Sequence, residues 1–213
     1  AINKGASDLV FKPFRLEELL LRLKRVLKER RLTRERNRIL SKLENLAITD
    51  GLTKLYNLRH FYNLLEIEID RCRRYGHSLA LLLADIDNFK VYNDTYGHLE
   101  GDKVLVRIGQ IIRSCLRTMD SAFRYGGEEF TVILPETSAQ EANNVAHRIR
   151  TAVEFENFFP EPENVVTVTI SIGVTEYYNK ELLAEFIKRA DQAMYLSKER
   201  GRNAISSLFA ENS

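Results

Sequence analysis

The chain has 213 residues, of which 44% are apolar and 29% charged, and its formal net charge is +2. This composition suits one globular domain plus a further segment and argues against a disordered chain, while the small charge identifies no partner. No apolar run is long enough to span a bilayer, and no signal-peptide pattern is present. Cys72 and Cys115 lack metal-ligand spacing, so we expect buried thiols in a reducing compartment. These features predict a cytoplasmic protein without a membrane partner.

Residues 1–14 form a short mixed segment, and because the chain starts with Ala1 we expect a fragment of a longer protein. Residues 5–14 (Gly-Ala-Ser-Asp-Leu-Val-Phe-Lys-Pro-Phe), with residues 16–19 after them, resemble the last strand and helix of a response-regulator receiver domain. In that family the lysine of the Lys-Pro pair contacts the phosphoryl group, and Lys12 corresponds to it. The resemblance implies two-component signalling, with only the C-terminal end of the receiver domain present.

Residues 15–49 are predicted to form a long, highly charged helix, because residues 15–48 contain neither Gly nor Pro. Apolar residues repeat at a spacing that suits one packed face, and the repeat resumes in a shifted register after a basic section; these residues are Leu16, Leu20, Leu23 and Leu27, then Ile39, Leu43 and Leu46. We predict a coiled coil that joins two copies in a homodimer. A solvated helix that only spaces two domains is the alternative. Nucleic-acid binding is disfavoured, because no aromatic residues alternate with the basic ones.

Residues 50–213 alternate helical and strand patterns, as a compact domain does. Residues 79–84 are a continuous apolar run, which predicts a buried central strand. The run ends at Asp85. A carboxylate at the end of a buried strand is a frequent metal ligand, but it could equally cap the next helix.

A Gly-Gly pair lies between two β-prone runs, residues 121–125 and 129–134. Glycine reaches the positive φ that a tight turn needs, so the pattern predicts a β-hairpin with Glu128 and Glu129 at its tip. If Asp85 lies beside this tip, each pair of like charges near 4 Å costs about 4 kcal/mol at an effective dielectric constant of 20. A hard cation, Mg²⁺ or Mn²⁺, would offset that repulsion and indicates phosphoryl or nucleotidyl transfer on a nucleoside triphosphate.

The sequence Gly-Gly-Glu-Glu-Phe at residues 126–130 resembles the signature of the GGDEF family, the diguanylate cyclases. The resemblance extends over roughly residues 50–205 and rests on several motifs in order. Besides the signature, they lie at residues 50–57, 85–90, 93–98, 101–102, 171–174, 190–195 and 198–203.

The resemblance implies that Asp85 and Glu129 hold a pair of Mg²⁺ or Mn²⁺ ions per active site, with the carbonyl of Ile86 as another ligand. Glu128 would lie beside the 3′-hydroxyl of GTP as general base or as a further metal ligand. The implied reaction joins two GTP into cyclic di-GMP and releases two pyrophosphates. Each 3′-hydroxyl must attack the other molecule's α-phosphate, so two domains must face each other, and the predicted helical dimer would hold them close.

The same resemblance assigns the substrate contacts. The backbone at Asn88 and Phe89 would cradle the phosphates, as amides at a helix start can. Lys90 would add positive charge there. Lys198 and Arg202, which share a helix face at a spacing of four, would bind the triphosphate. Without the resemblance these cations would be read as part of a solvated surface.

Asn93 and Asp102 would hydrogen-bond the guanine edge; without the neighbouring motifs they would be read as helix caps. Arg117 and Asp120 form an Arg-x-x-Asp pattern at the place of the family's product-inhibition site. Arg can bind a guanine edge or a phosphate and Asp can accept from guanine N–H groups, so we predict an inhibitory cyclic di-GMP site with Arg148 as a second contact. A surface ion pair is the alternative.

The expected fold is α+β, with a mostly antiparallel sheet flanked by helices, like the palm of nucleotidyl cyclases with its ferredoxin-like core. The leading function is a diguanylate cyclase. A catalytically weak module that binds GTP or cyclic di-GMP is one alternative, and a segment whose main role is dimerisation through its coiled coil is another.

Overall fold

The computed structural model describes residues 15–178 and 180–209. The chain divides into two compact units, Ala1–Ala47 and Ile48–Ser213. The receiver-like segment with Lys12 lies outside the described residues, so that assignment and the proposed domain boundaries stay predictions.

The first unit contains the long helix α1 (Leu16–Ile48), as predicted. Leu16, Leu20, Leu23 and Leu27, the predicted packing positions, are all exposed in the single chain. These four leucines are therefore available for a partner.

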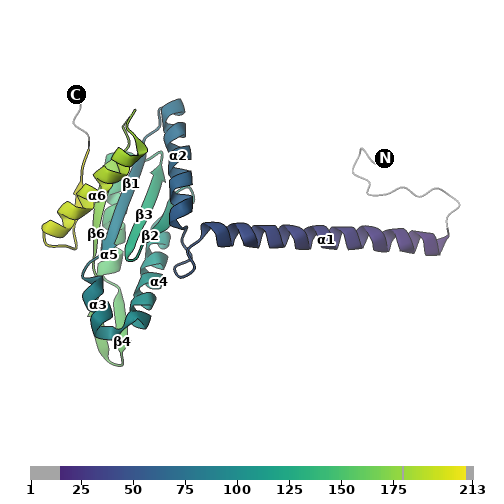
Figure 1. Ribbon diagram of the computed structural model, residues 1–213, viewed down its shortest axis with the longest axis horizontal. Coiled ribbons are helices and arrows are strands. Elements are labelled where there is room, and N and C mark those ends of the chain that lie inside the picture. The colour runs from purple at the N-terminus through teal and green to yellow at the C-terminus, as the bar shows by residue number, and fades with distance from the viewer. Residues whose placement is uncertain (1–14, 179, 210–213) are drawn as a thin grey trace. The chain divides into compact units, whose positions relative to one another are not determined.

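The second unit is built around one five-stranded sheet with the strand order β2-β3-β1-β6-β7 (Figure 1). Neighbouring strands are antiparallel except for the parallel pair β6–β7. A separate two-stranded ribbon, β4–β5, lies outside this sheet. The elements are α2 (Leu58–Tyr75), β1 (Leu79–Ile86), α3 (Phe89–Tyr96), α4 (His98–Ser114), β2 (Ser121–Gly126), β3 (Glu129–Pro135), α5 (Ala139–Glu154), β4 (Asn157–Glu161), β5 (Asn164–Thr167), β6 (Ile170–Glu176), α6 (Leu183–Glu199) and β7 (Ile205–Ser207).

The order β1, α3–α4, β2, β3, α5, β6 forms the split βαββαβ arrangement of ferredoxin-like folds, with β3 between β1 and β2. The predicted α+β fold is therefore confirmed. The predicted hairpin is also present, although its turn consists of Gly127 and Glu128, because Gly126 still belongs to β2.

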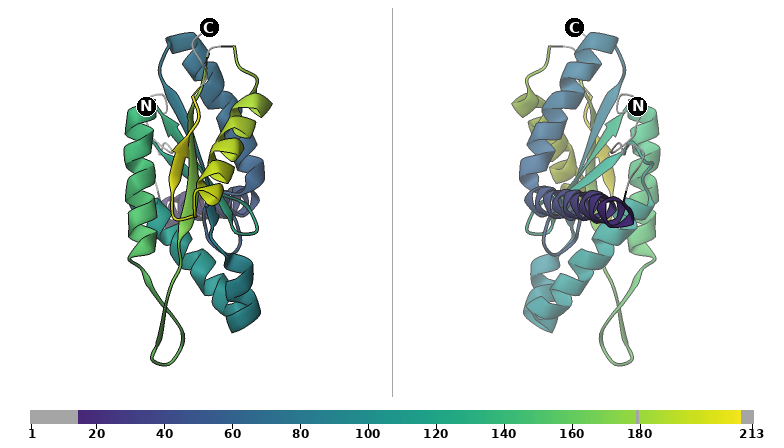
Figure 2. Two further views of the ribbon diagram at one scale, coloured as in Figure 1. Left: turned by 90° about the vertical axis from the view of Figure 1, so that its left-hand side faces the viewer. Right: turned by 90° about the vertical axis from the view of Figure 1, so that its right-hand side faces the viewer.

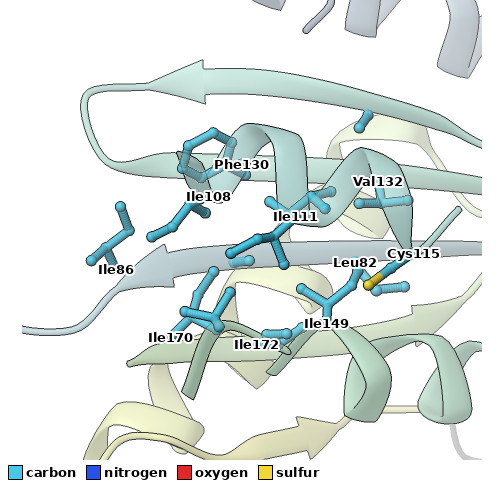
Figure 3. Close-up of a cluster of buried hydrophobic side chains, with 14 of the residues drawn as sticks. Leu82, Ile86, Ile108, Ile111, Cys115, Phe130, Val132, Ile149, Ile170 and Ile172 are labelled. Carbon is cyan, nitrogen blue, oxygen red and sulfur yellow. The ribbon is translucent and has the colours of Figure 1, made fainter. Parts of the chain in front are cut away.

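Strand β1 is buried along its whole length because helices cover both faces of the sheet. Its alternate side chains enter two separate cores: Leu82 and Ile86 pack with α4 and α5, whereas Leu81 and Leu83 pack with α2 and α6. Figure 2 shows α5 on one side of the sheet and α2 and α6 on the other. Figure 3 shows Leu82 and Ile86 in the first core.

Helix α6 packs very closely on β6 at Gly173. A Cβ atom there would overlap the carbonyl oxygen of Ala190 and the amide nitrogen of Met194, both backbone atoms of the helix. Only glycine permits this approach without a shift of the helix. The contact sets the height of α6 above the sheet, and thereby the position of the side chains at its C-terminal end.

Both cysteines are free thiols, as expected, but only Cys115 is buried. Cys72 is partly exposed, and its thiol donates to the carbonyl of His77 at 2.8 Å. It lies near the C-terminal end of α2, before the chain turns into β1, so the prediction of burial was wrong for this residue. Among the helices that the structure describes, none has the length and apolarity needed to cross a membrane.

Candidate active site

The tip of the β2–β3 hairpin is held against the end of β1. Gly127 has φ +45°, a left-handed conformation that glycine adopts readily. The guanidinium of Arg124 donates to the carbonyl of Gly127 at 3.0 and 2.8 Å and lies 3.4 Å from the carboxylate of Asp50. On the other side, the amide of Ile86 donates to the carbonyl of Glu128 at 3.4 Å. These contacts bring the acidic tip beside the last residues of β1.

Asp85 lies directly opposite Glu129 in the β1–β3 register, as the sequence analysis required. The ammonium of Lys198, at the end of α6, lies 2.8 Å from Oδ1 of Asp85. Burial raises the pKa of Asp85, and the ion pair with Lys198 only partly offsets this effect. The site therefore collects two carboxylates and one ammonium from three elements.

Burial is also the largest cause of the raised pKa of Glu129. The charges of Asp85 and Asp191 raise it further, and Glu128 adds a smaller repulsion. Three other acidic side chains thus raise the pKa of Glu129 at this end of the sheet. Among the causes of that shift, only the positive charge of Lys198 lowers the pKa.

This donor set fits a hard divalent cation, since two facing carboxylates with raised pKa values gain from a positive charge between them. Over the described part of the chain, no three acidic, histidine or cysteine side chains are arranged to hold a metal by themselves. Mg²⁺ commonly binds through one or two carboxylates and completes its shell with water and substrate phosphates. Asp85 and Glu129 match that mode of binding.

The chain turns sharply between β1 and α3. Asn88 has φ +55°, and its side chain makes no capping hydrogen bond. Phe89 is buried and anchors the start of the helix, whereas Lys90 is exposed. The first amides of α3 thus lie directly after the strand that carries Asp85, where an anion could accept from them.

A second polar position lies between α3 and α4. The Oδ1 atom of Asn93 is buried and accepts no hydrogen bond within the described residues. A Cβ atom at Gly101 would overlap this oxygen, so glycine leaves the room that the oxygen occupies. Asp102 follows on α4 and is exposed. An orphaned acceptor is costly unless a ligand or water donates to it.

Residues 47–204 match the family model described as "Diguanylate cyclase, GGDEF domain". The chain belongs to the GGDEF family. The chain is 43% identical over 170 residues to diguanylate cyclase A of Treponema denticola, across 78% of this chain and 46% of that protein. The chain is also 39% identical over 208 residues to response regulator PleD of Caulobacter vibrioides, across 96% of this chain and 46% of that protein. The chain thus spans about half the length of these curated relatives.

Solved structures agree with the fold. The coiled coil and GGDEF domain of DgcB from Caulobacter crescentus, in complex with c-di-GMP, matches with a TM-score of 0.78 at 32% identity. The match covers 89% of this chain and 99% of that chain. The active GGEEF domain of a diguanylate cyclase from Vibrio cholerae matches with a TM-score of 0.68 at 31% identity, over 75% and 99%.

Two of the predicted inhibitory residues, Arg117 and Asp120, lie in the GGDEF domain at the turn before β2. The amide of Arg117 donates to the carboxylate of Asp120 at 2.8 Å, which closes a tight turn and leaves the Arg117 side chain exposed. Arg148, on α5, donates from Nε to the carbonyl of Cys115 at 3.0 Å. Arg148 therefore lies beside the segment that leads into this turn.

Three further residues at this site had no role predicted from the sequence. Arg124 supports the hairpin turn, Asp191 faces Glu129 from α6, and Asp87 accepts three hydrogen bonds at the end of β1. Except for Gly127, which accepts from Arg124, their partners lie far away in the sequence, so no local pattern pointed to their roles. The one available signal was position, since Asp87 lies between the predicted site residues Ile86 and Asn88, and Arg124 lies four residues before Glu128.

Proposed function

We propose that this chain is a diguanylate cyclase that condenses two GTP into cyclic di-GMP with release of two pyrophosphates. The observation that carries the proposal is the facing pair Asp85 and Glu129, with Lys198 beside it, in a GGDEF domain. In each half of the reaction, a 3′-oxygen forms a bond to the α-phosphorus of the other GTP. The bond from that phosphorus to the β-phosphate oxygen breaks, and the proton of the hydroxyl leaves to a base or to solvent.

Asp85, Glu129 and the carbonyl of Ile86 would hold Mg²⁺ or Mn²⁺. When bound, such an ion would stabilise charge on the phosphate and favour the ionised hydroxyl. Glu128 lies in the hairpin turn and is half-buried. We assign it to the reacting 3′-hydroxyl, either as general base or as a further metal ligand, since a base must be within hydrogen-bond reach of the proton that it removes.

The phosphate contacts follow from the elements around β1. The amides at Asn88 and Phe89 would donate to phosphate oxygens, and the exposed Lys90 and Arg202, with the half-buried Lys198, would add positive charge. Lys198 is well placed for this role because it already lies 2.8 Å from Asp85, at the end of the strand that precedes these amides.

Asn93 and Asp102 would recognise guanine. The support is the buried Oδ1 atom of Asn93, which accepts from no described residue and which a guanine N–H group could satisfy. A carboxylate at Asp102 would accept from a second N–H group of guanine. Adenine presents a different pattern of donors and acceptors on that edge, so the pair would favour GTP over ATP.

Dimerisation follows from the chemistry. One domain binds one GTP, so two domains must meet for each 3′-hydroxyl to reach the other α-phosphate. The exposed leucines of α1 would pair with those of a second copy, as a coiled coil. This pairing would raise the effective concentration of one catalytic domain near the other. Replacement of Leu20 and Leu27 by Glu should then lower cyclase activity, with sedimentation showing a shift toward monomer.

We further propose that cyclic di-GMP inhibits its own synthesis by binding at Arg117, Asp120 and Arg148. The exposed Arg117 side chain could bind a guanine edge or a phosphate, and Arg148 lies close to the same turn. Arg117→Ala should make the initial rate insensitive to added cyclic di-GMP. Unchanged inhibition would exclude this site.

The decisive experiment is chromatography of the products formed from GTP and Mg²⁺ by wild type, Glu128→Ala and the surface control Glu163→Ala. Cyclic di-GMP from wild type and the control, but not from Glu128→Ala, would support the cyclase with Glu128 in its site. Wild-type protein that is dimeric, free of bound cyclic di-GMP and able to bind GTP, yet makes no product, would instead favour the binding module.

A further inference from the structure

The turn after α6, residues 200–203, has an unusual backbone. Arg202 has φ +65° and Asn203 has φ +44°, so two consecutive non-glycine residues lie in the left-handed region. Asparagine enters this region fairly often, but arginine seldom does. Such conformations persist where the surrounding structure holds them, and they are frequent at functional sites.

Asn203 is held at three of its atoms. Its backbone amide donates to Oδ2 of Asp87 at 2.9 Å. Its side-chain oxygen accepts from Arg150 at 2.7 Å, and its side-chain nitrogen donates to Glu154 at 2.8 Å. Arg150 and Glu154 lie on α5 and pair with each other at 2.9 Å. Contacts from two elements thus define the conformation of the turn.

Asp87 is itself fixed. It is only 7% exposed, although it carries a carboxylate. Besides the amide of Asn203, it accepts from the hydroxyl of Thr169 at 2.7 Å and from that of Ser171 at 2.6 Å. Its own amide donates to the carbonyl of Thr169 at 2.9 Å. Asp87 therefore joins the turn after α6 rigidly to the strand ends beside Asp85.

The side chain that this arrangement presents is that of Arg202. It is exposed, and no hydrogen bond or ion pair holds it within the part of the chain that the structure describes. We propose that Asp87 and Asn203 are positioning residues that hold the backbone of Arg202 so that its guanidinium meets the triphosphate of the bound nucleotide. This inference rests on the proposed function. It adds two residues that would act through Arg202 without touching the substrate.

A double-mutant cycle tests the proposal by calorimetric titration of a non-hydrolysable GTP analogue with Mg²⁺. In the wild-type background, Arg202→Ala should weaken binding by about tenfold, as loss of a charge-assisted contact does. The Asn203→Gly background accepts the positive φ but lacks both contacts to α5. In this background Arg202→Ala should weaken binding of the analogue by less than about threefold. If Asn203 only stabilised the fold, Arg202→Ala would weaken binding by the same factor in both backgrounds. That result would overturn the proposal.

Two further variants serve as backgrounds for Arg202→Ala. Asp87→Asn provides a second background in which the same reduced cost is expected, should Asn203→Gly fold poorly. Thr175→Val is the matched control, because it removes the hydrogen bonds of a β6 hydroxyl with Leu208 and Arg189, away from the turn. In this background Arg202→Ala should weaken binding of the analogue by the full factor. If wild type does not bind the analogue, the proposed function fails and this role fails with it. Equal costs in all backgrounds would overturn the positioning role alone.

Discussion

Lys198 lies 2.8 Å from Asp85, and this ion pair joins the end of α6 to the end of β1. Asp85 also faces Glu129 across the β1–β3 ladder. The Lys198 ammonium therefore lowers the pKa of two adjacent carboxyl groups, Asp85 and Glu129. Both pKa values are nevertheless raised overall. The site retains an excess of negative charge that a bound cation would offset.

Replacement of Glu129 by Gln should stabilise the fold at neutral pH, by on the order of 1 kcal/mol, because an ionised and repelled carboxylate is removed. A carboxyl group whose pKa is raised in the folded state favours folding when protonated. That contribution is present below the unfolded pKa and is lost as the pH rises through the folded pKa. The gain from Glu129→Gln should therefore shrink as the pH falls.

Urea unfolding across a range from acidic to neutral pH measures this difference, with the exposed Glu163→Gln as the control. A wild type that is as stable as Glu129→Gln at neutral pH would contradict the argument. Activity should be lost in the same variant.

The substitution Gly101→Ala should block the polar position between α3 and α4. The added Cβ atom would overlap Oδ1 of Asn93, a side-chain atom that can move, so the fold should survive. The displaced amide could no longer meet guanine, and GTP affinity should fall by about tenfold or more.

The matched control for this change is Gly51→Ala, since a Cβ atom at Gly51 meets nothing within 4 Å. Calorimetric titration with GTP and with ATP gives both affinity and selectivity. If Gly101→Ala binds GTP as tightly as Gly51→Ala does, the guanine assignment of Asn93 is wrong.

The close contact of α6 with β6 predicts that an alanine at Gly173, unlike one at Gly101, destabilises the fold. A Cβ atom there would overlap the helix backbone, which cannot move as a single side chain can. Gly173→Ala should therefore cost about 1–3 kcal/mol of stability, as overpacking does. Gly109→Ala, whose Cβ atom would lie 3.3 Å from the Thr53 side chain, should cost less. Thermal unfolding of both variants checks the order, and equal midpoints would argue against the close packing.

Arg124 supports the catalytic hairpin and is expected to matter for rate as well as stability. Burial raises the pKa of Asp50, but hydrogen bonds from Thr53 and the charge of Arg124 outweigh it, so the net pKa is lowered. Arg124→Ala should cost about 1–3 kcal/mol, since it leaves the carbonyl of Gly127 without this donor and Asp50 without its cationic partner.

The loosened turn should also reduce the rate of cyclic di-GMP formation by about tenfold or more, because small displacements of reacting groups are costly. Arg107→Ala is the control; its ion pair with Glu156 is largely exposed and should contribute less than about 1 kcal/mol. A normal rate in folded Arg124→Ala protein would show that the turn needs no such support.

Local patterns in the sequence predicted the parts of this protein that depend on neighbouring residues. The apolar run at residues 79–84 predicted the buried strand β1, and the Gly-Gly pair predicted the hairpin that carries Glu128 and Glu129. The absence of Gly and Pro predicted α1. In each case the periodicity or the turn chemistry lies within a few residues, so it can be read without the fold.

Only the tertiary structure decided which of these parts meet. Asp85 faces Glu129 because β3 lies between β1 and β2 in the sheet. Lys198 reaches Asp85 because Gly173 lets α6 approach β6. Asp87 holds the turn at Asn203, which lies at the far end of the domain in sequence. The family motifs in the sequence named the residues of the candidate site, but long-range pairing and packing set their distances, burial and charge balance.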